Sequence, residues 1–236
     1  MKKICLLLFV CFAGAVFPLR GEVFLLRPLG KNGGSVSDIP LCKVLPGLEN
    51  ASSLLAEPMK INGRDFTLEV FSSSARFEDI LHFLNAKGIR FAQSNDSLRC
   101  SSLLADGTIE RIMAVKSPGR GAVTVFRIAG RGGLPPVQAW PRELPELPPG
   151  ARALQVIELP KRNCVYGAFD CSSQDPAGNL RTLDAVLRNQ GWQAAGKEAS
   201  PLIGGTGDIY YHKLDRRVIW VTFDNSGAGA FCSRRL

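Results

Sequence analysis

The sequence predicts an α+β fold of two tandem modules, each with a β-hairpin, one helix and antiparallel strands, joined by a proline-rich linker. Residues 131–150 contain six prolines and three glycines, a density that excludes a helix or a central strand. The segments on either side show strand and helix patterns in the same order. These two observations divide the chain into a signal peptide (1–21), an extended arm (22–57), a first module (58–130), the linker (131–150) and a second module (151–236).

The first module opens with a predicted hairpin. Asn62-Gly63 is a strong signal for a two-residue turn. Phe66, Leu68 and Val70 then alternate with polar residues, as expected of a half-buried strand.

A helix is predicted to follow this hairpin. Residues 72–74 offer a serine N-cap, and Phe77, Ile80 and Leu84 recur at helical spacing. Gly88 stands where a left-handed residue would end the helix.

The second module repeats this order. Residues 154–159 and 164–170 are expected to pair as a hairpin, and Asp175-Pro176 is a typical helix start. Placing Gly88 on Gly191 aligns the apolar positions of the two helices, with Leu84 on Leu187. After each helix we expect a strand pair: 111–115 with 122–128, and 217–221 with 230–234.

The glycines of SPGRGAVTVFRIAGRGG (117–133) suggest a phosphate-binding loop. A dinucleotide fingerprint would need glycine where Thr124 stands and a helix after it, and no Gly-Lys-Ser/Thr follows. The Val, Phe and Ile residues favour a strand instead. We therefore expect a hairpin turn here and no cofactor.

The N-terminus has the layout of a secretory signal peptide. Lys2 and Lys3 precede an uncharged, mostly apolar run over residues 4–17, and small residues follow at Ala15 and Gly21. This run is shorter than the roughly 20 residues of a spanning helix. We expect cleavage after Ala15 or Gly21, which leaves a periplasmic or secreted chain without a transmembrane segment. The cut after Gly21 removes Lys2, Lys3 and Arg20 and lowers the net charge from +8 to about +5.

Five cysteines remain after this cleavage: Cys42, Cys100, Cys164, Cys171 and Cys232. In an oxidising compartment some are expected to pair. The layout of the second module favours a Cys164–Cys232 disulfide, with Cys42–Cys100 as an alternative pair. No CxxC is present, so the sequence predicts no metal site.

Catalytic motifs are missing from the sequence. It has two histidines, His82 and His212, and no G-x-S-x-G or H-E-x-x-H pattern. The candidate nucleophile is Cys171, between a strand and a helix, with His212 as its base. This leaves a secreted hydrolase-like enzyme, using Cys171 near an inter-module cleft, as an alternative.

Basic residues gather in one predicted hairpin of the first module. Arg216-Arg217 and Arg234-Arg235 add charge to the equivalent region of the second. Nucleic acid would fit such charges, but export argues against it, and an acidic protein fits the compartment better. The predicted binding residues are Arg111, Lys116, Arg120, Arg127 and Arg131.

The function expected from the sequence is therefore that of an exported, non-catalytic binding or assembly protein of a bacterial cell envelope. Its partner would be another envelope protein. A soluble periplasmic binder of an acidic ligand remains a further alternative, and the sequence leaves the oligomeric state open.

Overall fold

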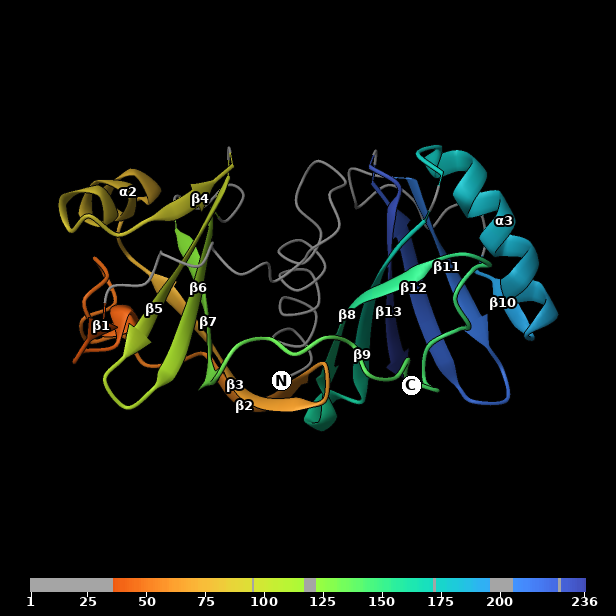
Figure 1. The fold of residues 1–236 in the computed structure, drawn as a ribbon, viewed down its shortest axis with the longest axis horizontal. Coiled ribbons are helices and arrows are strands. Elements are labelled where there is room, and N and C mark those ends of the chain that lie inside the picture. Colours follow the sequence, from red (N-terminus) through yellow and green to blue (C-terminus); the bar gives the residue numbers. More distant parts are fainter. Residues whose placement is uncertain (1–35, 95, 117–121, 172, 196–205, 225) are drawn as a thin grey trace. The chain divides into compact units, whose positions relative to one another are not determined.

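A computed structural model describes residues 36–94, 96–116, 122–171, 173–195, 206–224 and 226–236 (Figure 1). These described residues form two α-helices, α2 (Phe77–Ala86) and α3 (Pro176–Asn189), and two 3₁₀ turns, η1 (Leu41–Lys43) and η2 (Pro160–Arg162). The strands are β1 (Val36–Ser37), β2 (Leu55–Ile61), β3 (Arg64–Ser73), β4 (Phe91–Gln93), β5 (Ser97–Leu104), β6 (Thr108–Lys116), β7 (Val123–Arg131), β8 (Arg152–Leu159), β9 (Cys164–Asp170), β10 (Trp192–Ala194), β11 (Thr206–His212), β12 (Arg217–Phe223) and β13 (Ala228–Arg235).

The predicted fold of two tandem modules was wrong, because these strands belong to one sheet. Its order is β1-β5-β6-β7-β3-β2-β8-β9-β13-β12-β11-β10, with β4 on β5, and every pair except β1 with β5 is antiparallel. The pairing of Lys60 and Ile61 in β2 with Glu158 and Ile157 in β8 makes the ladder continuous. Strand alternation predicts which faces are buried, but not which edges pair.

Contacts divide the chain into two compact units. The first, here the N-terminal unit, holds residues 36–59 and Arg64–Leu134 of the described chain. The second, the C-terminal unit, holds Lys60–Gly63 and Pro135–Leu236.

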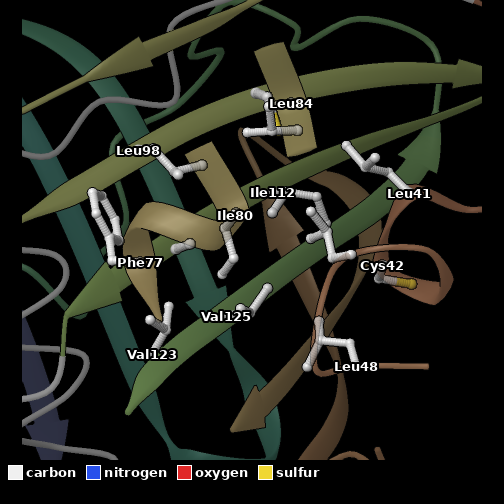
Figure 2. Close-up of a cluster of buried hydrophobic side chains, with 13 residues drawn as sticks. Leu41, Cys42, Leu48, Phe77, Ile80, Leu84, Leu98, Ile112, Val123 and Val125 are labelled. Atoms are coloured by element: carbon white, nitrogen blue, oxygen red, sulfur yellow. The ribbon is translucent and has the colours of Figure 1, made fainter. Parts of the chain in front are cut away.

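The core of the N-terminal unit lies between α2 and one face of its strands (Figure 2). Phe77, Ile80 and Leu84 of α2 are buried at the spacing that the sequence predicts. They pack with Leu98, Cys100, Ile112, Ala114, Val123 and Val125. The helix gains its stability from this apolar contact.

Both ends of α2 have a clear physical cause. The predicted serine N-cap does not form, because the helix begins after Arg76, whose backbone N–H donates to the Asp79 side chain at 3.1 Å. At the other end, Gly88 takes the predicted left-handed conformation, with φ 64°.

Part of the predicted extended arm packs into this core. Leu41, Leu45 and Leu48 are buried against it, and η1 forms the start of this segment. Residues 22–35 of the arm, and the predicted signal peptide, lie outside the described residues.

The C-terminal unit has its core between α3 and the strands β9, β11, β12 and β13. Leu183 and Leu187 of α3 are fully buried there. The proline-rich segment has neither helix nor strand after Arg131, as its composition predicts. It also contributes to this core, because Leu144 is buried and the Trp140 ring meets Phe169 edge-on at 6.3 Å.

The segment that suggested a phosphate loop forms strand β7. Val123–Arg131 pairs with both β3 and β6, as the hairpin prediction requires. Residues 117–121, the expected turn, lie outside the described residues. Within the described part of the chain, no helix is long and apolar enough to cross a membrane.

Candidate functional site

The predicted basic hairpin does not form a single cationic surface. Strand register places Arg127 opposite Ile112, so Arg111 points to the other face of the sheet. Arg131 is exposed at the end of β7. Arg120 lies outside the described residues.

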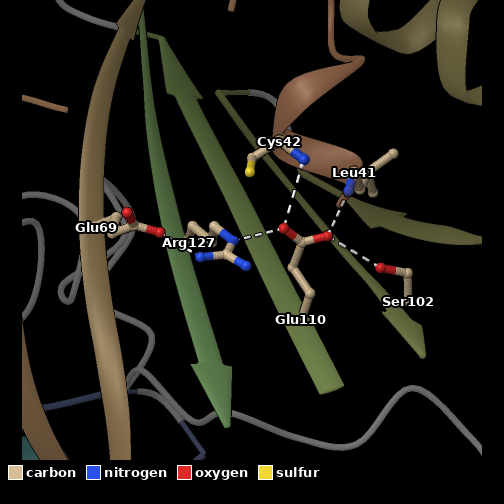
Figure 3. Close-up of polar contacts among 6 residues, drawn as sticks. All are labelled: Leu41, Cys42, Glu69, Ser102, Glu110 and Arg127. Atoms are coloured by element: carbon tan, nitrogen blue, oxygen red, sulfur yellow. Dashed lines mark hydrogen bonds and ion pairs between the residues drawn. The ribbon is translucent and has the colours of Figure 1, made fainter. Parts of the chain in front are cut away.

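Arg127 is held inside the N-terminal unit by two carboxylates (Figure 3). Its Nε donates to Glu110 Oε1 at 2.6 Å, and its Nη1 pairs with Glu69. Burial lowers the pKa of Arg127, but the hydrogen bonds to Glu110 and Glu69 outweigh it and leave the pKa raised. The positive charge of Arg127 is therefore neutralised within the fold.

Glu110 is the centre of this cluster and has no exposed side-chain surface. Besides Arg127, it accepts hydrogen bonds from the Leu41 backbone N–H at 2.6 Å and the Ser102 hydroxyl at 3.1 Å. The Cys42 N–H also points to it, at 3.5 Å. Glu110 thus fastens the η1 segment to the sheet, a structural role that the sequence analysis missed. The sequence does contain a signal for this role: a glutamate stands at a position of the alternating strand that faces the core, where a buried carboxylate needs hydrogen-bond partners.

Lys116 and Arg111 also have contacts within the unit. Lys116 pairs with Glu78 at 3.1 Å, and its Nζ lies 4.8 Å from the centre of the Phe77 ring. Arg111 lies over the Phe66 ring at 5.7 Å, and burial lowers its pKa. Its Nη1 is buried with no hydrogen-bond partner among the described residues. The predicted binding residues that the structure describes therefore mostly contact other residues of the same unit, and they do not lie together on one surface.

A denser basic surface lies at one end of the C-terminal sheet. Strand β12 begins at Arg217, which pairs with His212 at the end of β11 and with Arg235 at the end of β13. Strand β13 also pairs Arg234 with Cys164, the first residue of β9. Three segments therefore meet at this end, which Figure 1 shows near the C-terminus. Their basic residues, here called the basic end, are Lys161, Arg162, Lys213, Arg216, Arg217, Arg234 and Arg235.

Arg217 and Arg235 stand directly opposite each other on neighbouring strands. Like charges in this position destabilise a sheet. Neither makes an ion pair with any residue that the structure describes, and Arg217 Nη1 donates to the Ser233 hydroxyl at 3.2 Å. The pair therefore keeps two cations close together at the sheet end.

The turn before β12 presents further polar and apolar groups. Arg216 has φ 51°, an uncommon conformation for a residue with a side chain. Asp215 is drawn to His212, with Oδ2 3.0 Å from Nδ1. Leu214 is 90% exposed, and Leu236 beside this turn is 67% exposed. The basic end thus combines cations with exposed aliphatic side chains.

The structure does not bring Cys171 and His212 together. Cys171 follows the end of β9, where Asp170 pairs with Ala228, whereas His212 lies at the end of the sheet where β9 begins. Six residues of strand separate these ends, about 20 Å. Burial and the neighbouring Asp170 raise the pKa of the Cys171 thiol, which is the opposite of activation.

The predicted disulfide partners do lie near each other. The Sγ atoms of Cys164 and Cys232 are 3.8 Å apart, on neighbouring strands of the C-terminal unit. No disulfide joins them in this structure, so the bond stays a prediction. No group of residues suited to hold a metal ion occurs in the described ranges.

Comparisons with known proteins give little further information. No protein-family model matches this chain, and no curated protein does. Among solved structures, it is similar to the apo structure of the immunity protein TplEi of T6SS from Pseudomonas aeruginosa, with 13% sequence identity over 79% of this chain and 83% of that one. The TM-score is 0.23, which is too low to show a shared fold, so this likeness carries no argument about function.

Proposed function

We propose that this chain is an exported, non-catalytic protein of a bacterial cell envelope that binds an acidic partner through the basic end of its C-terminal unit. The observation that carries the proposal is the cross-strand pair of Arg217 and Arg235. A sheet is more stable with opposite charges at such positions. Two arginines held there instead suit a surface whose neutralising carboxylates come from a partner.

Two features favour binding over the enzyme alternative. Cys171 and His212 lie at opposite ends of the strands, so the proposed nucleophile and base are not within reach of each other. The thiol pKa of Cys171 is raised, which disfavours the thiolate. A binder of a small acidic ligand is a second candidate, because the same cations would serve it.

Export is the part of the proposal that rests on the N-terminal sequence alone. Expression in a bacterial host with a functional secretion pathway should give a periplasmic protein that lacks its first 15 or 21 residues. Intact mass spectrometry of the periplasmic fraction measures this. A full-length chain retained in the cytoplasm would overturn the export claim.

The binding claim is tested by reversing charge at the cross-strand pair. Tagged wild-type protein and the Arg217→Glu/Arg235→Glu variant are cross-linked in the native host, and the captured proteins are compared by mass spectrometry. We expect the reversal to abolish capture of an acidic partner, and rising salt to weaken wild-type capture.

The matched control for this test is Arg142→Glu/Arg181→Glu, which changes the charge equally at exposed positions outside the basic end. It should retain the partner. Equal capture by wild type and both variants would contradict the proposal, whereas capture of no protein together with binding of a small acid would support the second candidate.

A further inference from the structure

We infer that the tip of the β2–β3 hairpin, residues Lys60–Gly63, is a latch that makes the folding of the C-terminal unit depend on the N-terminal unit. Strands β2 and β3 belong mainly to the N-terminal unit, but the four residues of their tip belong to the C-terminal unit. The described chain therefore crosses between the units after Met59, after Gly63 and after Leu134. The latch does not depend on the identity of any partner.

The tip completes one edge of strand β8. Lys60 stands opposite Glu158, and Ile61 stands opposite Ile157. Ile61 has no exposed surface and Ile157 is 1% exposed, so two buried apolar side chains face each other at this pairing. Without the tip, the backbone groups of β8 at these positions would lose their partners.

Asn62 holds the tip in place with both its backbone and its side chain. Its backbone N–H donates to the Val156 carbonyl at 2.8 Å, and its side-chain oxygen accepts from the Val156 N–H at 2.7 Å. Its side-chain nitrogen donates to the Pro135 carbonyl at 2.6 Å. This one residue therefore joins the hairpin tip to β8 and to the start of the proline-rich segment.

The shape of the tip depends on the two strands that lead into it. Asn62 and Gly63 have φ 51° and 82°, the conformation of a tight two-residue turn between paired strands. The flanking strand residues, 55–59 of β2 and all of β3, belong to the N-terminal unit. An isolated hairpin is at best marginally stable in water, so unfolding of that unit would leave the tip without a fixed shape. The C-terminal unit would then lose the ordered partner of β8.

One further hydrogen bond on the N-terminal side supports the latch. Arg64, the first residue after the tip, donates from Nη1 to the Gly133 carbonyl at 2.7 Å, and both residues belong to the N-terminal unit. This bond is exposed to water, whereas the bond from Asn62 to Pro135 is partly buried. Because a hydrogen bond is stronger where water is excluded, we expect Asn62 to contribute more to the latch than Arg64.

The positions of the tryptophans allow the C-terminal unit to be followed on its own. The chain has three, Trp140, Trp192 and Trp220, and all lie in that unit. Tryptophan fluorescence during urea unfolding therefore reports on the C-terminal unit, whereas far-UV circular dichroism reports on both units. For the wild type we expect the two signals to give the same urea midpoint, since coupled units unfold in one transition. Two separate midpoints in the wild type would overturn the latch.

A double-mutant cycle separates the latch from a general effect on stability. Leu84→Ala weakens the core of the N-terminal unit, and coupling requires it to lower the fluorescence midpoint as far as the circular-dichroism midpoint. Asn62→Gly keeps a residue suited to positive φ but removes both side-chain hydrogen bonds. In the Asn62→Gly background, Leu84→Ala should therefore shift the fluorescence midpoint less than about half as far.

Asn163→Gly is the matched control for this cycle. Asn163 lies in the C-terminal unit with φ 49°, and its exposed side chain makes no hydrogen bond with any described residue. In this background Leu84→Ala should shift both midpoints as it does in the wild type. A full shift of the fluorescence midpoint in the Asn62→Gly background would overturn the latch, and so would an equal loss of coupling in the Asn163→Gly background.

A milder variant keeps the test decisive if Asn62→Gly does not fold. Asn62→Asp retains the acceptor for the Val156 N–H and removes only the donor to the Pro135 carbonyl. A reduced shift of the fluorescence midpoint by Leu84→Ala in this background supports the latch, and an unchanged shift contradicts it. Partner capture enters none of these measurements, so the latch and the proposed function stand or fall separately.

Discussion

Glu110 is the most deeply buried carboxylate among the described residues, and both of its side-chain oxygens accept hydrogen bonds. Its partners come from η1, β5 and β7, so one side chain holds together segments distant in sequence. A buried charge of this kind is tolerated only while it remains paired.

Replacing Glu110 tests this view. Glu110→Ala would leave the Nε of Arg127 and the Leu41 N–H without an acceptor, and we expect the free energy of unfolding to fall by about 3–5 kcal/mol. The control is Glu78→Ala, which removes the exposed pair with Lys116 and should cost less than about 1 kcal/mol. Urea unfolding measures both, and similar losses would show that Glu110 does not have this role.

Because of its buried thiols, the protein is expected to lose folding stability at alkaline pH. Burial raises the pKa of Cys100 to about 12, from 9.0 for an exposed thiol. Between these values the unfolded chain loses the proton and the folded chain keeps it, so folding stability falls as pH rises above about 9. Cys100→Ala should reduce this decline by about 1.4 kcal/mol per pH unit. Urea unfolding of wild type and Cys100→Ala at several pH values measures this decline. Below pH 8 the free energy of unfolding should change with pH equally in both proteins, which is the internal control. An equal decline of both proteins above pH 9 would contradict the prediction.

A disulfide between Cys164 and Cys232 would show that the protein folds in an oxidising compartment. Their Sγ atoms are 3.8 Å apart, and a disulfide bond of about 2.05 Å requires the two side chains to move closer together. Protein exported and purified without reductant should yield a peptide joining the two cysteines, with about 2–4 kcal/mol of added stability over the Cys164→Ser variant. Non-reducing peptide mapping that finds both thiols free would dismiss the bond.

At the scale of elements, each α-helix is held by a leucine with no exposed surface, Leu84 in α2 and Leu187 in α3. Truncation of Leu187 to Ala should lower the free energy of unfolding by about 2–5 kcal/mol, because the cavity cannot fully collapse. Arg181→Ala, at an exposed position on the same helix, is the control and should change it by less than about 0.5 kcal/mol. A loss no larger than that of the control would mean that α3 is only loosely packed.

Local turn and helix chemistry was predictable from the sequence. Asn62 and Gly63 have φ 51° and 82°, as the predicted two-residue turn requires, and Gly191 ends α3 with φ 86°. These features depend on a few adjacent residues. The η1 packing and the Arg76 cap were missed, because each depends on partners that the local pattern does not specify.

At the scale of the whole molecule, the sequence did not predict the continuity of the sheet. Pairing of β2 with β8 joins residues almost a hundred positions apart, through backbone groups that carry no sequence signal. The basic end was noticed only in part for the same reason. Arg216-Arg217 and Arg234-Arg235 were visible as charged pairs, but their alignment with Lys161 and Arg162 follows from strand register.

The most direct test of the account is photo-cross-linking from a single surface position in the native host. A photoreactive residue replaces Leu214 at the basic end and, in a matched control, Leu54, which is 61% exposed in the N-terminal unit. We expect position 214, and not position 54, to capture an acidic envelope protein, and Arg217→Glu/Arg235→Glu to abolish the capture. Equal capture from both positions, or capture from neither, would contradict it.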